Sequence, residues 1–261
     1  MRESKTVLIT GASGGLGYEF AKLFAKDKYD LVLVARNKEK LTETAKELKN
    51  INDNIFIKII PEDLSDPTTP QKIYDELKTD GITIEVLVNN AGFATYGNFY
   101  ELDEKKEMEE IEVNVKTLTH LTRLFLPDMV ERKYGKILNI ASVAAFQPGP
   151  FMAVYYATKA YVLHFSEAIA EELKGTGVTV TVLCPGPTKT GFQNRAGMQN
   201  VKSFTAYNMN AQTVAKIGYE GLMKEKRIVV PGLRNTIMSQ AYRIVPRSLV
   251  TRVAKNMQQG G

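Results

Sequence analysis

The segment VYYATKAY, residues 154–161, places two tyrosines close to one lysine. Tyr155 lies four residues before Lys159 and Tyr156 lies three before it, so on a helix either phenol can neighbour the ammonium group. A nearby cation favours the phenolate and lowers the pKa of a phenol from its ordinary value of ~10. Such a pair is suited to moving a proton to and from an alcohol. Spacing alone does not decide between the two tyrosines.

A serine could assist this proton transfer. Ser142 follows an expected strand at 135–141, and its hydroxyl can donate a hydrogen bond to a carbonyl oxygen without changing charge. Open parallel sheets bind ligands at the carboxyl ends of their strands, where Ser142 would lie. Taken alone, a serine there is more often part of a turn, and a Tyr–Lys pair is more often a surface pair. Their meaning depends on the rest of the chain.

A glycine-rich turn follows the first apolar segment. Residues 10–17 read T-G-A-S-G-G-L-G and lead into a helical pattern. Glycines allow a ligand to approach the backbone closely, and the N-terminus of the following helix offers unpaired N–H groups to phosphate. The spacing differs from the tighter G-x-G-x-x-G pattern, but its place between a strand and a helix favours a dinucleotide site. The residues expected at this site are Gly11, Ser13, Gly14, Gly15, Leu16 and Gly17.

The end of the second expected strand bears on the identity of the dinucleotide. Folds that bind NAD place a carboxylate there, on the ribose 2′-hydroxyl. This chain has Val34-Ala35-Arg36-Asn37 instead. The planar guanidinium of Arg36 suits a 2′-phosphate, so we expect NADP(H) as the cofactor. The alternative is that Arg36 is an ordinary solvated cation of a loop.

Apolar, β-rich segments alternate with helical patterns along most of the chain. We expect strands at 6–10, 30–35, 55–60, 83–89, 135–141, 178–184 and 227–230. We expect helices at 15–28, 37–50, 68–79, 101–132, 154–174 and 210–225. The alternation predicts an α/β fold, a doubly wound parallel sheet of about seven strands with helices on both faces.

Composition limits the class of protein. The chain has 261 residues, of which 44% are hydrophobic and 24% charged, as in ordinary soluble globular proteins. No apolar run is long enough to span a membrane, and the start lacks the pattern of a signal peptide. Cys184 is the only cysteine, so we expect neither an internal disulfide nor a cysteine-based zinc site. We expect a cytoplasmic protein without a metal site.

The positive charge is concentrated at one end of the chain. The net charge is +5, but residues 226–261 hold seven Lys/Arg and no acidic residue. The other 225 residues hold 27 basic and 29 acidic side chains, so the main body is nearly neutral. Nucleic-acid-binding proteins typically carry a basic stripe across the fold, so we do not expect nucleic acid as a partner.

We divide the chain into a single catalytic domain, residues 1–232, and a basic appendage, residues 233–261. In the appendage apolar residues recur every four positions, and Pro246 should break it into two amphipathic pieces. The appendage could cover a substrate mouth, contact a partner subunit, or lie at an anionic membrane surface. A capping helix with a solvated basic face is equally open.

Two segments are expected to bind an apolar substrate. Residues 187–210 mix Gly, Asn and Lys with aromatic side chains, which is typical of a substrate loop that closes over a site. The loop after Gly92 could form the opposite wall with Phe93, Tyr96, Phe99 and Tyr100. Some of these aromatic residues could equally be part of the core.

Taken together, the motifs resemble the short-chain dehydrogenase/reductase family in its compact single-domain form. The matching motifs are T-G-x3-G-x-G at 10–17, N-N-A-G at 89–92, Asn114 in V-N-V, Ser142 after N-I-A, Y-x-x-x-K at 155–159 and P-G at 185–186. Each motif is short, but their order and spacing are specific. The segment L-V-A-R-N-K-E-K-L is also similar to that of 3-oxoacyl reductases and hydroxysteroid dehydrogenases.

The resemblance implies a Rossmann-type fold and a role for each matching residue. Tyr155 would donate and accept the proton, Lys159 would assist it, and Ser142 would orient the carbonyl group. Asn114 would hold a water relay. The residues that would border the cofactor are Asp63 and Leu64 at the adenine, Asn90, Ala91 and Gly92 along its length, and Pro185, Gly186, Thr188 and Thr190 at the nicotinamide. Family members commonly form dimers or tetramers through two long helices, here 101–132 and 154–174.

The expected function is an NADP(H)-dependent oxidoreductase that interconverts a carbonyl and a secondary alcohol on a small, largely apolar substrate. A 3-oxoacyl chain or a steroid-like ketone would fit. The alternative is a non-catalytic dinucleotide-sensing protein on the same fold, which would not need Ser142, Tyr155 and Lys159 together. A sugar epimerase would need a longer substrate domain than the chain after Gly186 allows.

Overall fold

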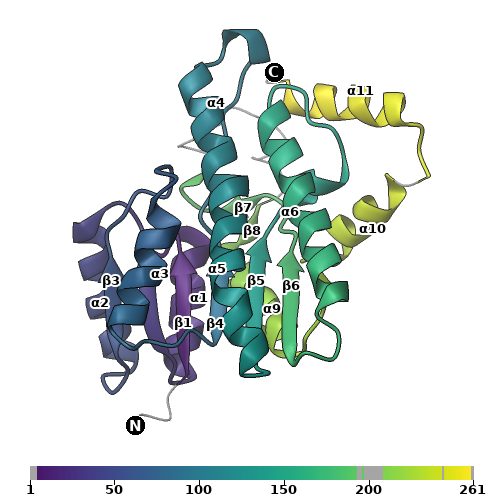
Figure 1. Cartoon of the computed structure of the whole chain (residues 1–261). Helices are drawn as coiled ribbons and strands as arrows, with labels where there is room; N and C mark the ends of the chain where they lie inside the picture. The colour runs from purple at the N-terminus through teal and green to yellow at the C-terminus, as the bar shows by residue number, and fades with distance from the viewer. Residues whose placement is uncertain (1–4, 193–195, 197–207, 243, 260–261) are drawn as a thin grey trace.

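A seven-stranded parallel sheet forms the centre of the protein (Figure 1). The computed structural model describes residues 5–192, 196, 208–242 and 244–259. The strands are β1 (Thr6–Thr10), β2 (Asp30–Val34), β3 (Ile57–Ile60), β4 (Val86–Asn89), β5 (Gly135–Ile140), β6 (Val178–Leu183) and β9 (Ile228–Val229). Their spatial order is β3-β2-β1-β4-β5-β6-β9, and every neighbouring pair is parallel. The predicted α/β fold is confirmed.

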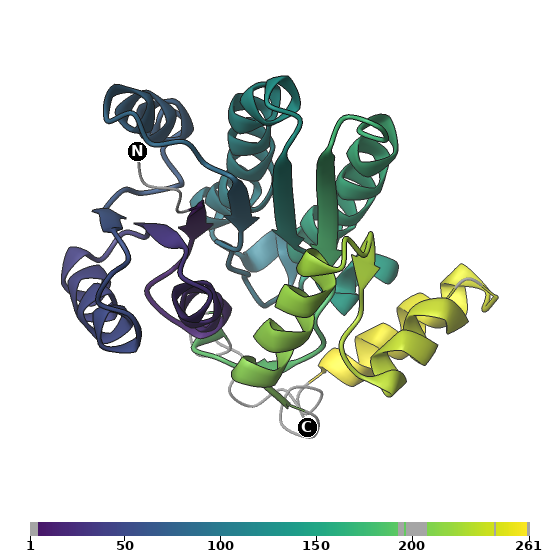
Figure 2. The ribbon, with the colours of Figure 1, turned by 90° about the horizontal axis from the view of Figure 1, so that it is seen from below.

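Helices cover both faces of this sheet, as Figure 2 shows. One face carries α1 (Gly15–Lys26), α2 (Lys38–Ile51) and α9 (Ala211–Met223), and the other carries α3 (Thr69–Thr79), α5 (Leu118–Glu131) and α6 (Ala153–Glu172). Because successive side chains of a strand point to opposite faces, each strand contributes to both layers. Val7 and Ile9 of β1 lie in the core cluster under α1, whereas Leu8 lies in the opposite cluster.

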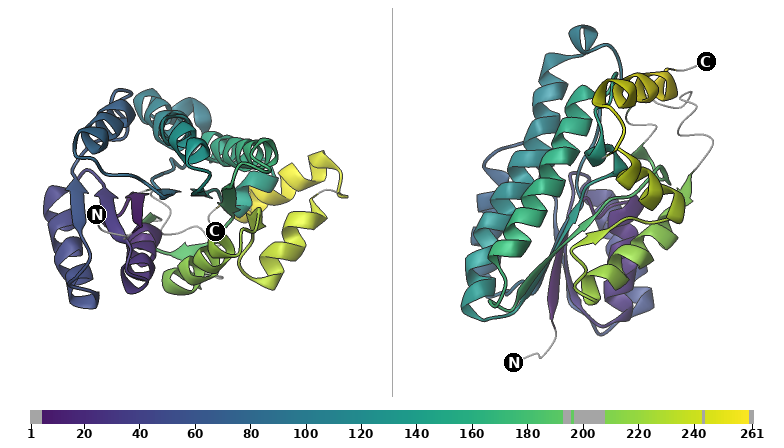
Figure 3. Two further views of the ribbon diagram at one scale, coloured as in Figure 1. Left: turned by 60° about the horizontal axis from the view of Figure 1, so that its bottom comes forward. Right: turned by 90° about the vertical axis from the view of Figure 1, so that its right-hand side faces the viewer.

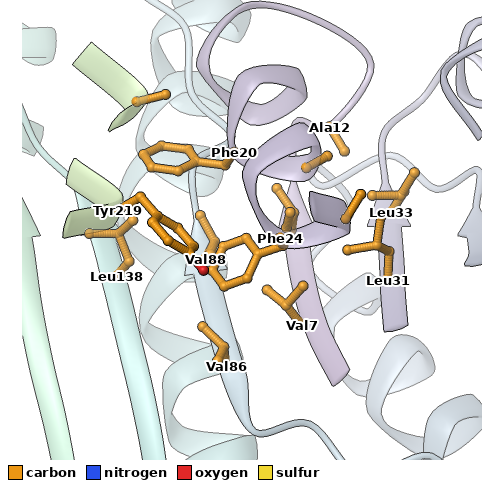
Figure 4. Packing of buried hydrophobic residues seen from close by; sticks show 14 of the residues in the cluster. Val7, Ala12, Phe20, Phe24, Leu31, Leu33, Val86, Val88, Leu138 and Tyr219 are labelled. Atoms are coloured by element: carbon orange, nitrogen blue, oxygen red, sulfur yellow. The ribbon is translucent and has the colours of Figure 1, made fainter. Parts of the chain in front are cut away.

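Phe24 lies at the centre of the core under α1 (Figure 4). Its ring is fully buried and makes edge-to-face contacts with Tyr29 and Tyr219, at centroid distances of 5.1 Å and 4.9 Å. Such contacts add to the stabilisation that burial of the ring already provides. Helix α1, which carries Phe24, is thereby fixed to the sheet and to α9.

The segment predicted as one helix at 101–132 is interrupted in the structure. A short 3-10 turn, η1 (Phe99–Glu101), precedes α4 (Glu104–Ile111), and a π-helical segment, η2 (Glu112–Thr117), joins α4 to α5. The π segment carries Asn114. The apolar pattern of this segment did not predict the π-helical turn. Such widened turns occur frequently at functional sites.

The C-terminal segment forms two helices that project beyond the β9 edge of the sheet (Figure 3). These are α10 (Leu233–Ala241) and α11 (Arg247–Gln258), and Pro246 directly precedes α11, as its ring would predict. The division of the chain at residue 232 stays a prediction. In the described part of the chain, no helix is both long and apolar enough to cross a membrane.

Two very short strands follow β6 in sequence. They are β7 (Thr188–Lys189) and β8 (Met209–Asn210), which pair with each other. They lie at the two ends of the predicted substrate loop, 187–210. Most of that loop lies outside the described residues.

The packing of Phe24 leads to a stability prediction. Phe24→Ala should lower the free energy of unfolding by about 3–5 kcal/mol, because it removes a fully buried ring and leaves a cavity. Phe99→Ala removes a ring that is 63% exposed and should change the free energy by no more than about 0.5 kcal/mol. Urea unfolding followed by circular dichroism measures both. Equal losses would contradict the placement of Phe24 in the core.

Candidate active site

A cavity of about 590 Å³ opens at the carboxyl ends of the central strands. The chain leaves β1 towards β2 and β3 on one side and continues from β4 on the other, and such a switch in strand order leaves a crevice that binds ligands. Predicted residues that line the cavity after β1 and β4 are Gly11, Gly14, Gly15, Leu16, Asn90, Ala91 and Gly92. Those after β5 and β6, or on α6, are Ser142, Tyr155, Lys159, Pro185, Gly186, Thr188 and Thr190.

Thr10 joins the two strands that flank the crevice. Its Oγ1 accepts hydrogen bonds from the backbone N–H groups of Asn90 and Ala91, at 2.9 Å and 3.0 Å, and donates one to the carbonyl of Val88. The Asn90 side chain returns a hydrogen bond of 2.8 Å to the carbonyl of Thr10. We had not predicted a role for Thr10, although it directly precedes the glycine-rich turn.

The glycine-rich turn brings the start of α1 close to the end of β1. A Cβ on Gly17 would lie 2.3 Å from the carbonyl oxygen of Gly11, so no larger residue fits at position 17. Gly14, directly before α1, has no atom within 4 Å of where a Cβ would lie, and no side chain caps the helix among the described residues. Open space beside uncapped N–H groups fits the pyrophosphate of a dinucleotide. Ser13 is half-buried in the same turn but does not line the cavity.

Arg36 and the residues predicted to border adenine lie outside the cavity lining. Arg36 and Asp63 are exposed and face each other, with Nη1 and Oδ2 4.0 Å apart. They come from the loops after β2 and β3, next to the glycine-rich turn. The side chain of Leu64 is buried in the core, and its carbonyl accepts a hydrogen bond of 2.8 Å from Thr117. Only the backbone at Leu64 therefore remains a candidate for contacting adenine.

Ser142 and Tyr155 meet inside the cavity. Ser142 follows β5 and starts the 3-10 turn η3 (Val143–Phe146), where its Oγ accepts a hydrogen bond of 3.1 Å from Ala144 N–H. Tyr155 lies in the first turn of α6. Burial raises the pKa of the Tyr155 hydroxyl above its ordinary value, and a hydrogen bond with Ser142 opposes part of that rise.

Lys159 is buried one helical turn beyond Tyr155. Its Nζ donates a hydrogen bond of 2.8 Å to the carbonyl of Ile140 and lies 5.7 Å from the centre of the Tyr155 ring. Burial lowers the pKa of Lys159 to about 8, and the negative charge of Glu110 works in the opposite direction. Burial at this site therefore disfavours both the phenolate of Tyr155 and the ammonium of Lys159.

The expected lowering of the Tyr155 pKa by Lys159 was wrong for this structure. Burial is the largest cause and raises the pKa of Tyr155, and the ammonium binds the Ile140 carbonyl rather than the phenol oxygen. At neutral pH the phenol is protonated, which suits a proton donor better than a base.

Asn114 connects the loop after β4 to α6. Its Oδ1 accepts from Phe93 N–H at 3.2 Å, and its Nδ2 donates to the Phe93 carbonyl at 3.0 Å and to Thr158 Oγ1 at 3.1 Å. Thr158 in turn donates to the carbonyl of Tyr155 at 2.7 Å. Asn114 does not line the cavity. Its geometry indicates a residue that positions its neighbours, and its predicted role in a water relay stays a prediction.

Tyr156 also lines the cavity, and its hydroxyl contacts the C-terminal helices. Its hydroxyl accepts a hydrogen bond from the side-chain amide of Gln258, while the Tyr96 hydroxyl donates to the Gln258 carbonyl at 2.6 Å. Burial raises the pKa of Tyr156 to about 12. These contacts fix the end of α11 against the cavity.

The C-terminal helices form one wall of the cavity, which sequence reasoning left open. The residues that line it from this side include Leu233, Met238, Ser239, Tyr242, Ala254, Met257 and Gln258. No local pattern could have identified them, because Gln258 is 102 residues from Tyr156 and 162 from Tyr96.

The predicted aromatic walls are only partly present. The ring of Phe192 lies 5.4 Å from that of Tyr155 and lines the cavity. Phe99 and Tyr100 both lie in the 3-10 turn η1, are exposed and do not line the cavity. Phe93 packs against the core cluster beneath α5 instead.

A buried carboxyl lies behind Lys159, and we had not predicted it. Glu110 of α4 is fully buried, and its Oε2 accepts hydrogen bonds from Thr95 N–H at 3.0 Å and from Thr95 Oγ1 at 3.1 Å. Glu107, one turn earlier, is also buried and bonds the same hydroxyl. Burial raises the pKa of Glu110 to about 7, while the charge on Lys159 opposes the rise.

Comparison with known proteins identifies the family. Residues 5–219 match the short chain dehydrogenase family. Ketoacyl reductase HetN of Nostoc sp. is 36% identical over 182 residues, which are 70% of this chain and 63% of that protein. The very-long-chain 3-oxoacyl-CoA reductase of Anas platyrhynchos is 32% identical over 249 residues, 93% of this chain and 76% of that protein.

A solved structure agrees with this assignment. A short-chain dehydrogenase from Sphingobium yanoikuyae in complex with NADPH superposes with a TM-score of 0.83 and 32% identity, covering 92% of this chain and 94% of that chain. The present chain therefore belongs to the short chain dehydrogenase family. It spans less than two thirds of the length of HetN. The family match ends at residue 219, before α10 and α11.

The burial of Glu110 leads to a pH prediction. Burial raises the pKa of Glu110 from its ordinary value of 4.5 to about 7. The carboxyl therefore lowers the stability of the fold increasingly as pH rises from about 4.5 to about 7, and by a constant amount at higher pH. The difference amounts to about 3 kcal/mol. Glu110→Gln should therefore gain stability over wild type as pH rises from about 5 to about 8, by up to that amount.

Urea unfolding at a series of pH values measures this difference. Glu104→Gln, an exposed residue of the same helix, is the control and should follow wild type. Glu107, Tyr155 and Lys159 also act on Glu110 electrostatically, and they are present in both variants. Parallel pH curves for wild type and Glu110→Gln would contradict the raised pKa.

Proposed function

We propose that this chain is an NADP(H)-dependent oxidoreductase that interconverts a ketone and a secondary alcohol on a largely apolar substrate. The observation that supports this most is the meeting of Ser142, Tyr155 and Lys159 in one cavity with the glycine-rich turn. A protein that only sensed a dinucleotide would have no use for a buried ammonium and two converging hydroxyls. The sensor is the alternative that the experiments below separate.

The residues around the cavity suit a nicotinamide dinucleotide. The open space at Gly14 leaves room for the pyrophosphate at the start of α1, and residues 90–92 and 185–190 border the remaining length. When bound, the dinucleotide supplies or accepts the hydride. We assign the 2′-phosphate of NADP(H) to Arg36, and the NADPH complex of the similar Sphingobium protein supports that choice.

On the other side of the cavity, Ser142 and Tyr155 would bind the carbonyl group of the substrate. In our proposal the hydroxyls of Ser142 and Tyr155 both donate hydrogen bonds to the carbonyl oxygen, which fixes its position and stabilises the negative charge that develops there. Tyr155 then gives its proton to the resulting alkoxide. Because burial keeps this phenol protonated, the proton is available at neutral pH.

The cation of Lys159 makes the loss of that proton less costly. When Tyr155 loses its proton, the resulting phenolate is a negatively charged neighbour for the desolvated ammonium of Lys159. The attraction between the two charges stabilises the phenolate. Lys159 is fixed by the carbonyl of Ile140, and Tyr155 is fixed through the contacts from Thr158 to Asn114. These hydrogen bonds keep the two groups in register on α6.

An apolar substrate fits the remaining walls. Phe192, Leu233, Met238 and Met257 bring large apolar side chains to the cavity. The relatives named ketoacyl reductase and very-long-chain 3-oxoacyl-CoA reductase support a 3-oxoacyl chain as the substrate class, and a steroid-like ketone fits the same chemistry. The substrate loop at 187–210 stays a prediction.

We also propose that the protein forms a homodimer or homotetramer through α4, α5 and α6. Met108 and Tyr161 lie on these helices and are exposed apolar side chains. A cytoplasmic location stays a prediction, and so does the absence of a metal. Among the described residues, no three His, Cys, Asp or Glu side chains gather as a metal site would require.

The central prediction concerns the two tyrosines. Tyr155→Phe removes the proton donor and should lower kcat/KM for ketone reduction by about 10²–10⁴-fold. Tyr156→Phe removes a hydroxyl that bonds Gln258 and should cost no more than about tenfold, mainly through KM. NADPH consumption with a panel of ketones and 3-oxoacyl thioesters measures both. Full activity of Tyr155→Phe would refute the mechanism, and wild type inactive on every carbonyl would favour the sensor.

The cofactor preference has a separate test. Arg36→Ala should weaken NADPH binding by about tenfold or more and leave NADH binding nearly unchanged, because only NADPH carries the phosphate that the guanidinium would pair with. Lys46→Ala, an exposed cation further along α2, is the control. Titration of the protein with each cofactor by fluorescence gives the affinities. An equal loss for both cofactors would contradict the assignment of Arg36.

A further inference from the structure

The C-terminal helices expose a group of large apolar side chains. We name the tail surface by its six members, which are between 43% and 86% exposed: Leu233, Ile237, Ile244, Leu249, Val253 and Met257. They come from α10, α11 and the connection between these helices. Single exposed apolar residues are normal on proteins, but six of them in one short C-terminal segment point to an interaction site.

Helix geometry explains how α11 both packs on the body and exposes an apolar face. Residues four apart lie on one side of a helix. Val250, Ala254 and Gln258 form the buried row that packs against the body. Leu249, Val253 and Met257 form the adjacent row, which stays exposed. The exposed row of α11 is therefore not used in packing the helix against the rest of the protein.

The charged residues around the tail surface are all basic, which favours an anionic partner. Arg247, Arg252 and Lys255 are exposed on α11, and no acidic residue occurs anywhere from 226 to 261. Two copies of the tail surface placed face to face would bring only like charges together. An apolar face flanked by Lys and Arg without acidic residues is typical of helices that lie in the plane of an anionic membrane surface.

The tail surface is continuous with the mouth of the cavity. Leu233 and Met257 belong to both, because they are exposed and also line the cavity. Met238, on the same helix as Leu233, is likewise exposed and lines it. A surface that covers these side chains also covers part of the cavity lining.

We propose that the tail surface binds an anionic lipid surface and so places the mouth of the cavity against the bilayer. The apolar row enters the boundary between headgroups and acyl chains, and the basic residues pair with lipid phosphates. An apolar ketone dissolved in the bilayer then reaches Ser142 and Tyr155 without crossing water. This last step rests on the proposed function, whereas the binding to lipid does not.

Co-sedimentation of the full chain with vesicles tests the proposal. Vesicles of phosphatidylcholine alone are compared with vesicles that also contain phosphatidylglycerol. We expect strong binding to the anionic vesicles, weak binding to the neutral ones, and a loss of binding as salt is raised. Absence of binding to the anionic vesicles would overturn the proposal.

Paired charge variants locate the contact. Arg252→Glu with Lys255→Glu should weaken binding to anionic vesicles by at least about tenfold. Lys46→Glu with Lys216→Glu makes the same change in net charge on α2 and α9 and should have an effect of about twofold or less. Equal losses in both double variants would mean that overall charge drives binding, which would also overturn the proposal.

An apolar variant separates a lipid partner from a second copy of the chain. Leu249→Ser with Val253→Ser keeps every charge and should weaken vesicle binding by about tenfold or more. Size-exclusion chromatography follows the same variant without vesicles. A change from dimer to monomer there, with vesicle binding intact, would show that a second copy covers the surface.

Turnover of a water-soluble ketone without vesicles keeps this test independent of the proposed function. None of the four substituted tail residues lines the cavity, so all variants should reduce such a ketone at the wild-type rate. If wild type reduces no carbonyl compound, the proposed function fails while the vesicle result still stands.

Discussion

The hydrogen bonds between Thr10 and the Asn90 segment are the constraint on which the site depends. Strands β1 and β4 are neighbours in the sheet although they are not consecutive in sequence. The loops that follow them lead to opposite sides of the sheet order. Because Thr10 and Asn90 bond each other's backbone, the two loops cannot separate. Gly92 is thereby held so close to Asn114 that a Cβ there would lie 2.9 Å from its Oδ1. Asn114 then fixes the helix that carries Tyr155 and Lys159.

The electrostatics of the site follow from desolvation rather than from attraction. Tyr155, Lys159 and Glu110 are all shifted towards their neutral forms, because burial is the largest cause in each case. Coulombic attraction between Lys159 and Glu110 offsets only part of that shift. The protein thus keeps the Tyr155 phenol protonated, while the pKa values of Lys159 and Glu110, about 8 and about 7, lie close to neutral pH. A charge that develops on a bound substrate would shift the protonation of these two groups.

The sequence predicted this fold better than it predicted the walls of the site. Alternating apolar segments located every strand of the main sheet, because buried parallel strands are continuous runs of Val, Ile and Leu. Helical spacing left Tyr155 and Tyr156 equivalent, and only the family pattern distinguished them. The structure directs Tyr155 to Ser142 and Tyr156 to Gln258, although the catalytic role stays a proposal. The direction of the Tyr155 pKa shift was missed and the place of α11 was left open among several alternatives, since burial and contacts across more than 100 residues are not local properties.

The contacts of Gln258 also affect the order in which the molecule is made. All seven strands of the main sheet are complete once Val229 has been synthesised, and the match to the family ends earlier still. The wall against Tyr96 and Tyr156 needs residue 258, which leaves the ribosome last among these groups. The sheet, with Ser142, Tyr155 and Lys159, can therefore form before the cavity wall that α10 and α11 contribute. Mutations at the end of such a chain would alter this wall and leave the part that folds first untouched.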